Sequence, residues 1–169
     1  MAFTFLKALN YETGKSLVSD EHIVFCKNML KKYPNKIILP VDFVVLEKET
    51  PIIKNIKEFE KDDVGYDIGS KTIKLFEKEI IAAKRVIVNG PMGLFEQKEF
   101  SKGTEKILKI LAKNKIKTVI GGGDTASAVN KFGYQDSFYH VSTGGGATIT
   151  YLENNTLVGI EAIEDKKVK

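Results

Sequence analysis

Residues 118–129 read TVIGGGDTASAV, a short apolar run, a triple glycine and the start of a helical pattern. The apolar run predicts a buried strand, and the small residues after the glycines favour a helix. A strand that passes through a glycine turn into a helix presents backbone amides and the positive end of the helix dipole to an anion. Asp124 lies inside this turn, where its carboxylate would repel a bare phosphate.

The same unit occurs on both sides of this stretch. An apolar strand pattern at 85–91, RVIVNGP, precedes it, and another at 138–146, FYHVSTGGG, follows it. Short apolar strands that alternate with helices and run into glycine are typical of a parallel α/β sheet. The carboxyl ends of parallel strands share one edge, so the glycine turns should converge on one crevice. We therefore predict a parallel, Rossmann-like α/β sheet with helices on both faces.

The amino-terminal part of the chain is read with the same rules. Residues 19–32 predict a helix with Ser19 as its cap and Cys26 buried. Residues 36–45, KIILPVDFVV, predict a short buried strand in which Pro40 sets a break or a bulge. The polar stretch 47–63 is predicted to be irregular or to form small antiparallel strands on the surface.

Three further helices are expected between the strands. The first covers 70–84, begins at Ser70 as its cap, and buries one side, formed by Ile73, Phe76, Ile80 and Ala83. The others cover 101–115 and 125–133. After the last strand, residues 150–163 predict a helix, a turn and a closing segment, and the charged residues 164–169 predict a solvated end.

Composition excludes several classes of function. The 169 residues carry a net charge of +4, but the positive charge is almost entirely lysine, with Arg85 as the only arginine. Nucleic-acid readers rely on arginine, so we expect no nucleic-acid partner. Cys26 is the only cysteine, which fits core packing in a reducing compartment. No apolar run reaches the length of about 18 residues needed to span a bilayer, so we expect a cytoplasmic protein without a membrane partner.

A dinucleotide-binding oxidoreductase is one alternative, because Gly121, Gly123 and Ala126 satisfy G-x-G-x-x-A after a strand. That fingerprint also requires an acid about 20 residues further on, to bind a ribose hydroxyl. The corresponding region, HVSTGGGA at 140–147, contains none. The P-loop pattern fails as well, because no Lys-Ser or Lys-Thr pair follows the glycines.

The position of Asp124 has two explanations. If the anion arrives with Mg²⁺, the carboxylate faces the cation while the amides of Gly122 and Gly123 face the phosphate oxygens. In the other explanation Asp124 caps the following helix, since aspartate is a favoured cap. The turn by itself leaves both open.

The three glycine motifs, VNGPMGLFE at 88–96, IGGGDTA at 120–126 and HVSTGGGA at 140–147, resemble the carboxyl-terminal half of phosphoglycerate kinases in order and separation. Residues 2–17 and 65–76 match as well, so the resemblance covers nearly the whole chain. It implies a glycolytic phosphotransferase with a carboxyl group as acceptor. Such an enzyme exchanges a phosphoryl group between 1,3-bisphosphoglycerate and ADP, giving 3-phosphoglycerate and ATP.

The resemblance also implies roles for matching positions. Glu96 would bind the ribose hydroxyls, and Asp124 would bind the Mg²⁺ of ADP or ATP. The amides of Gly123, Gly144, Gly145 and Gly146 would act in catalysis by facing the phosphoryl group in flight. The complete set implied to bind nucleotide is Leu17, Gly65, Tyr66, Asn89, Gly90, Pro91, Leu94, Glu96, Gly122, Gly123, Asp124 and Thr125.

The resemblance further implies that parts of the family pattern are missing. The amino-terminal domain that binds 3-phosphoglycerate has no counterpart here, nor do the first two strands of the nucleotide domain and a loop lysine that neutralises charge. We therefore expect residues 1–169 to be a partial carboxyl-terminal nucleotide-binding domain that is inactive, or nearly so, by itself. The complete enzyme would be monomeric.

By the strand order that the resemblance implies, the missing strands would lie in the centre of the sheet, between the segments 37–45 and 85–91. Their absence exposes hydrophobic edges, which favours self-association or pairing with another chain. The alternative function is thus a non-catalytic module that binds Mg-nucleotide, or an assembly module that completes its sheet with another chain.

Overall fold

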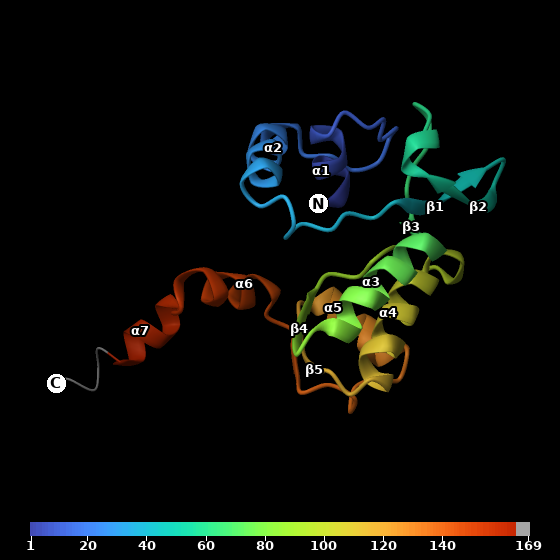
Figure 1. Cartoon of the computed structure of the whole chain (residues 1–169). Helices are drawn as coiled ribbons and strands as arrows, with labels where there is room; N and C mark the ends of the chain where they lie inside the picture. The colour runs from blue at the N-terminus through green and yellow to red at the C-terminus, as the bar shows by residue number, and fades with distance from the viewer. Residues whose placement is uncertain (165–169) are drawn as a thin grey trace. The chain divides into compact units, whose positions relative to one another are not determined.

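The computed structural model describes residues 1–164, so nearly all of the predicted solvated end at 164–169 lies outside the described residues. The chain divides into two compact units. Unit 1 comprises Met1–Glu79 and Met92–Ile107, and unit 2 comprises Ile80–Pro91 and the chain from Leu108 onward. Each unit contains one three-stranded sheet, and the order of the elements can be followed in Figure 1.

Unit 1 contains an antiparallel sheet in the order β2-β1-β3. Its strands are β1 (Asp42–Glu47), β2 (Thr50–Asn55) and β3 (Asp67–Ile68). Lys48 and Glu49 form the turn between β1 and β2 with φ of 47° and 67°, the left-handed geometry that suits a two-residue hairpin. The prediction of small antiparallel strands within 47–63 is therefore confirmed.

The strand predicted over 36–45 is only partly present. β1 begins at Asp42, after Pro40, and residues 37–41 carry no strand geometry. A strand needs a neighbouring backbone for its hydrogen bonds, and no described strand pairs with Ile37–Leu39. Pro40 therefore marks the start of the paired region.

The core of unit 1 lies between β1 and the first helix, α1 (Ala2–Ala8). The ring of Phe3 stacks on that of Phe43 with centroids 4.6 Å apart, and Phe59 meets Phe43 edge-on at 5.6 Å. Leu6 and Val45 are buried in the same cluster. These aromatic contacts fix the loop that follows β2 against the sheet.

The helix predicted over 19–32 is present as α2 (Ile23–Lys32), with Cys26 buried as predicted. The expected Ser19 cap is only partly present: Ser19 is the N-cap of a short 3-10 turn, η1 (Asp20–His22), directly before α2, but its side chain makes no cap hydrogen bond. Its hydroxyl contacts Glu21 and His22 instead. Two more 3-10 turns follow in unit 1, η2 (Ile56–Glu58) and η3 (Lys98–Phe100).

The helix predicted over 70–84 is α3 (Ser70–Ala82), but Ser70 is its first residue and not its cap. The carboxylate of Asp42, in β1, accepts hydrogen bonds from the amides of Lys71 and Thr72 at 2.9 and 2.7 Å. The apolar side of α3 is also less buried than predicted, because Thr72 is the residue of this helix that is fully buried. The residues predicted to be buried are only half-buried: Ile73, Phe76, Ile80 and Ala83.

Unit 2 contains the predicted parallel sheet in the order β4-β5-β6. Its strands are β4 (Arg85–Asn89), β5 (Lys117–Gly121) and β6 (His140–Ser142). The connecting helices are α4 (Lys102–Lys113), which begins in unit 1, and α5 (Gly123–Lys131). The α/β prediction is confirmed, and within the described residues β4 pairs on one side only.

The core of unit 2 is formed by the apolar side of its helices against β5. Its most deeply buried members are Leu108, Leu111, Ile120, Ala128 and Val129. After β6 the chain forms α6 (Gly145–Asn154) and α7 (Val158–Glu164), and Figure 1 shows α7 extending away from the parallel strands. None of the helices in residues 1–164 is long and apolar enough to cross a membrane.

Candidate functional site

The three glycine turns of unit 2 meet at the carboxyl ends of the parallel strands. Asn89, Gly121 and Ser142, the last residues of β4, β5 and β6, are register partners in the sheet. The amide of Gly122 donates to the carbonyl of Ser142 at 3.0 Å, which joins the second turn to the third. The predicted convergence of the turns is therefore present.

The approach between two of these turns requires glycine. A Cβ on Gly145 would lie 2.8 Å from the Cα of Gly122 and 3.2 Å from Oδ1 of Asn89. Gly122 itself has a φ of +98°, which L side chains rarely adopt. Any side chain at Gly145 would therefore push the second and third turns apart.

The start of α5 provides free amide donors. Gly122 is the N-cap, and Ala126 is the first residue whose amide bonds back to it, at 2.9 Å to the carbonyl of Gly122. The first amides of a helix have no partner within the helix, so those of Gly123, Asp124 and Thr125 are available to an anion. A Cβ added at Gly123 would meet nothing within 4 Å, which means that the space beside this backbone is open.

Asp124 lies in the first turn of α5 with an exposed side chain. The alternative that Asp124 caps this helix is wrong, because the N-cap is Gly122 and no side chain makes a cap hydrogen bond. Asp124 is already a helical residue, the second of α5, and does not occupy the cap position. Among the described residues no cluster of three or more His, Cys, Asp or Glu side chains could hold a metal. Asp124 is therefore a single carboxylate beside a helix N-terminus.

The Thr125 side chain links two of the turns. It is buried, and its Oγ1 accepts a hydrogen bond from the amide of Gly90 at 2.7 Å. Asn89 and Gly90 are thereby held against the start of α5, with Pro91 directly after them. The hydroxyl of Thr125 thus has a structural partner within the turns.

The third turn offers fewer amides than the sequence suggests. The amide of Gly144 donates to Oγ of Ser142 at 3.1 Å, and that of Gly145 donates to the carbonyl of Thr143 at 3.1 Å. Gly146 is different, because a Cβ placed there would meet nothing within 4 Å. Because Gly144 and Gly145 use their amides within the turn, the amide of Gly146 is the remaining candidate donor.

The other predicted residues lie in unit 1 and form a second set. Oγ of Ser16, next to Leu17, accepts a hydrogen bond from the amide of Gly65 at 3.1 Å. The amide of Leu94 donates to the carbonyl of Tyr66 at 2.9 Å. Three segments that are distant in sequence are thereby brought together, and two of them expose apolar side chains: Leu17 is 88% exposed and Leu94 43%.

Two contacts fix the shape of this second set. A Cβ on Gly65 would collide with Cζ, the tip of the Phe3 ring, so the backbone there packs closely against that ring. The ring of Tyr66 stacks on Phe100 with centroids 4.6 Å apart and an interplanar angle of 17°. Glu96 is exposed and follows the buried Phe95.

Sequence reasoning missed Asp42 and Asp67, two of the buried acids of unit 1. The carboxylate of Asp67 accepts hydrogen bonds from the amides of Ile68 and Gly103 at 2.8 and 2.7 Å. Burial raises the pKa of Asp67 to about 6, and its two backbone hydrogen bonds oppose that rise. A signal was present in the sequence, because each acid interrupts an apolar run, in PVDFVV and in GYDIGS.

A separate cavity of about 380 Å³ lies between the parallel sheet and α6. It is mostly apolar and is lined by residues that include Ile87, Val119, Tyr151 and Leu157. Gly144 is the only predicted site residue in its lining. Most of the candidate site at the strand ends therefore lies outside this cavity, which it meets at Ser142 and Gly144.

Comparison with known proteins gives a consistent result. The family model described as phosphoglycerate kinase matches residues 1–155. Phosphoglycerate kinases of Dictyoglomus turgidum and Finegoldia magna are each 47% identical over 174 residues, covering 98% of this chain and 44% of each relative. The solved phosphoglycerate kinase structure from Coxiella burnetii aligns with a TM-score of 0.84 at 36% identity, over 90% of this chain and 41% of that one. The chain therefore spans less than half the length of these relatives.

Proposed function

Because the chain belongs to the phosphoglycerate kinase family, we propose that it supplies the Mg-nucleotide site for reversible phosphoryl transfer between 1,3-bisphosphoglycerate and ADP, giving 3-phosphoglycerate and ATP. The observation that carries this proposal is the meeting of three glycine turns at the register-matched ends of β4, β5 and β6. Such a cluster offers amide donors and a helix N-terminus to phosphate oxygens.

In unit 2 we assign the phosphates to the amides at the start of α5 and to Gly146. Asn89, Gly90 and Pro91 border this region, with Gly90 held by Thr125. Gly144 and Gly145 keep the third turn against the second. In transfer, the amides of Gly123 and Gly146 stabilise the negative charge of the moving phosphoryl group.

The Asp124 carboxylate fits a magnesium ion that arrives with the nucleotide. It is exposed and lies next to donors that would hold phosphate oxygens. A phosphate-bound Mg²⁺ keeps several waters and takes one or two protein carboxylates, which matches a single aspartate. When bound, the ion neutralises phosphate charge during transfer.

In unit 1 we assign the adenosine to Leu17, Gly65, Tyr66 and Leu94, and its ribose hydroxyls to Glu96. Exposed apolar side chains beside a glycine backbone offer a flat contact for a purine ring. Leu17, at 88% exposed, has the most surface to bury against such a ring. This assignment is independent of the phosphate assignment in unit 2.

We further propose that the chain by itself binds nucleotide but transfers phosphate poorly. The proposed phosphate-binding residues include no lysine or arginine. Cationic groups on the transferred phosphoryl group contribute about 10³-fold or more to rates of phosphoryl transfer in related chemistry. Turnover by the purified chain at rates typical of kinases would contradict this part of the proposal.

A calorimetric titration tests the proposed site. ADP should bind the chain with Mg²⁺, and Asp124→Asn should weaken Mg-ADP binding by about tenfold or more, because a charged ligand to the ion is lost. Glu105→Gln is the matched control, since Glu105 is also an exposed acid in the first turn of a helix, α4. Equal affinities for Asp124→Asn and the unchanged chain would contradict the role of Asp124.

The second candidate is a non-catalytic module that binds Mg-nucleotide or completes its sheet with another chain. One observation favours it: within residues 1–164, β4 has a strand partner on one side only. An unpaired strand edge is a template for another chain. Sedimentation and a coupled turnover assay of the purified chain together separate the two candidates, since a monomer with measurable turnover excludes a non-catalytic or assembly module.

A further inference from the structure

Two loops of unit 1 carry part of the proposed adenosine site. The first, residues 12–17, ends with Leu17, and the second, residues 60–66, ends with Gly65 and Tyr66. Neither loop belongs to a helix or strand, so the sheet itself does not determine their conformation. Another set of contacts must hold them in place.

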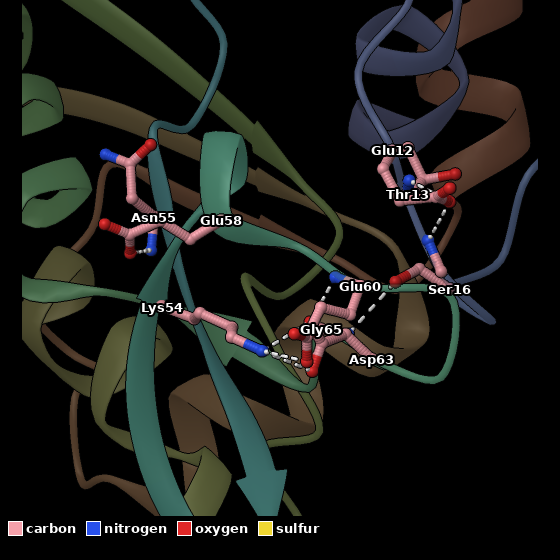
Figure 2. A network of polar contacts seen from close by, with 10 residues as sticks. Glu12, Thr13, Ser16, Lys54, Asn55, Glu58, Glu60, Asp63 and Gly65 are labelled. Carbon is pink, nitrogen blue, oxygen red and sulfur yellow. Dashed lines mark hydrogen bonds and ion pairs between the residues drawn. The ribbon is translucent and has the colours of Figure 1, made fainter.

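Lys54 of β2 reaches the second loop with its ammonium group, as Figure 2 shows. Its Nζ lies 2.9 and 3.2 Å from the two carboxylate oxygens of Asp63 and 3.1 Å from Oε2 of Glu60. The side chains of Lys54 and Asp63 are only 17% and 10% exposed, whereas that of Glu60 is 80% exposed. Lys54 and Asp63 therefore form a sheltered ion pair with Glu60 at its rim.

Asp63 connects this ion pair to both loops. Its carboxylate accepts a hydrogen bond from the amide of Glu60 at 2.6 Å, which closes the second loop on itself. Its carbonyl accepts from the amide of Lys15 at 2.8 Å, in the first loop. Gly14 has a φ of +55° and packs so closely on the Asp63 carbonyl that a Cβ would clash. One residue thus fixes the backbone of both loops.

The first loop has its own closing contacts next to this junction. Oε1 of Glu12 accepts from the amides of Thr13 and Gly14 at 3.0 and 2.9 Å, also visible in Figure 2. Oγ of Ser16 then accepts from the amide of Gly65 at 3.1 Å. The two loops are therefore tied at both ends of their contact, by Asp63 and by Ser16.

The strand that carries Lys54 is itself well anchored. Lys54 pairs in register with Phe43, a member of the buried aromatic cluster of unit 1. Directly after it, Asn55 and Glu58 form a capping box, in which the Asn55 amide donates to Glu58 and the Lys57 amide donates to Asn55. The ammonium group therefore extends from a rigid base toward the loops.

We propose that Lys54 is a positioning residue for nucleoside binding, holding the loops of Leu17 and of Gly65–Tyr66 through its sheltered ion pair with Asp63. This inference rests on the proposed function, because it concerns the same adenosine site. Removing the ammonium leaves the sheltered Asp63 carboxylate without its counter-charge, which disfavours the folded arrangement of both loops. Loops that are no longer held should lose affinity for the nucleoside, and not for the phosphates.

The test compares two ligands on the full chain: Mg-ADP, which carries adenosine, and Mg-tripolyphosphate, which does not. Lys54→Met should weaken Mg-ADP binding by about ten- to a hundredfold, because the loops that contact the adenosine are displaced. It should change Mg-tripolyphosphate binding by less than about twofold. Lys54→Arg should restore most of the ADP affinity, since it keeps the charge.

The control is Lys15→Gln. Lys15 pairs with Asp62 at 2.7 Å and so bridges the same two loops, but its side chain is 68% exposed and that of Asp62 is 87% exposed. Exposed pairs contribute little, so Lys15→Gln should leave both affinities unchanged. If Lys54→Met does not fold, Asp63→Asn removes the same pair with an isosteric side chain, and the two affinities are compared in the same way.

The outcomes separate this inference from the proposed function. If Lys54→Met loses affinity for both ligands equally, or for neither, the positioning role is overturned while the proposed function stands. An unchanged chain that binds neither ligand overturns the proposed function, and the positioning role with it. Hydrogen exchange adds a ligand-free measurement: the amides of Lys15 and Gly65 should exchange faster in Lys54→Met, and unchanged exchange at both overturns the inference.

Discussion

The buried carboxylate of Asp67 accepts a hydrogen bond from the backbone amide of Gly103 at 2.7 Å and so binds the amino-terminal turn of α4 from a strand 36 residues earlier. Asp42 does the same for α3, through the amides of Lys71 and Thr72. In both cases a strand acid takes the place of a local cap. The negative charge at a helix N-terminus is favourable, but its burial is costly.

Asp67 should make the stability of the chain depend on pH. Burial raises its pKa from 3.8 to about 6, so between these values the folded chain holds a proton that the unfolded chain has lost. The stabilising contribution is therefore complete below about pH 4 and is lost as the pH rises through 6. Over this pH range the free energy of unfolding falls by about 3 kcal/mol. Urea unfolding at several pH values measures it.

Asp67→Asn should flatten this part of the pH profile, because the titrating group is removed. Asp124→Asn is the control, since it removes an exposed carboxylate and leaves Asp67 in place. A profile of Asp67→Asn that runs parallel to that of the unchanged chain would show that another group is responsible.

Thr72→Val should destabilise unit 1. The hydroxyl of Thr72 donates to Oδ1 of Asp42 at 2.6 Å and accepts from the amides of Val41 and Asp42 at 3.0 and 3.1 Å, in a fully buried position. Valine has the same shape but leaves these groups unsatisfied, at a cost of about 1–3 kcal/mol. Thermal or urea unfolding reports the loss.

Thr50→Val is the matched control for that substitution. Thr50 is an exposed residue at the start of β2, where valine is at least as well accepted as threonine. Its unfolding free energy should change by less than about 0.5 kcal/mol. A similar cost at both positions would mean that the buried hydrogen bonds of Thr72 contribute nothing specific.

Gly145→Ala and Gly146→Ala should separate two roles within the third glycine turn. A Cβ at Gly145 lies 2.8 Å from the Cα of Gly122, so alanine should destabilise the turn and weaken Mg-ADP binding together. A Cβ at Gly146 meets nothing within 4 Å, and alanine in a helix should stabilise the fold by about 0.5–1 kcal/mol.

The same pair of variants tests the amide of Gly146. If Gly146 faces the phosphates, Gly146→Ala should reduce Mg-ADP affinity although it folds normally, because the methyl group occupies the open space. Calorimetric titration and urea unfolding of both variants give the comparison. An unchanged affinity in Gly146→Ala would remove Gly146 from the proposed site.

Cys26 should be unreactive in the folded chain. It is 4% exposed, and burial raises the pKa of its thiol, so little thiolate is present near neutral pH. A chromogenic disulfide reagent should label it slowly without denaturant and rapidly in urea. Rapid labelling of the native chain would indicate that α2 opens readily.

The order of elements and the family could be predicted from the sequence, because their signals are local. Apolar runs that end in glycine around residues 89, 121 and 144 indicate parallel strands with ligand turns, and three motifs at fixed separations indicate the family. Small antiparallel strands within 47–63 were also among the predicted alternatives, and β2 is one. Such features depend on residues that are neighbours in the chain.

The helix caps, the extent of the first strand and the packing of the turns were decided only by tertiary structure. Asp42 and Thr72 are 30 residues apart, and no local rule selects Asp42 over Ser70 as the cap of α3. Ile37–Leu39 have strand-forming side chains but no described strand to pair with. The close approach of Gly122 and Gly145 likewise depends on two strands that meet in a sheet. Each of these depends on contacts across the fold, and single-sequence patterns carry no information about which distant groups will meet.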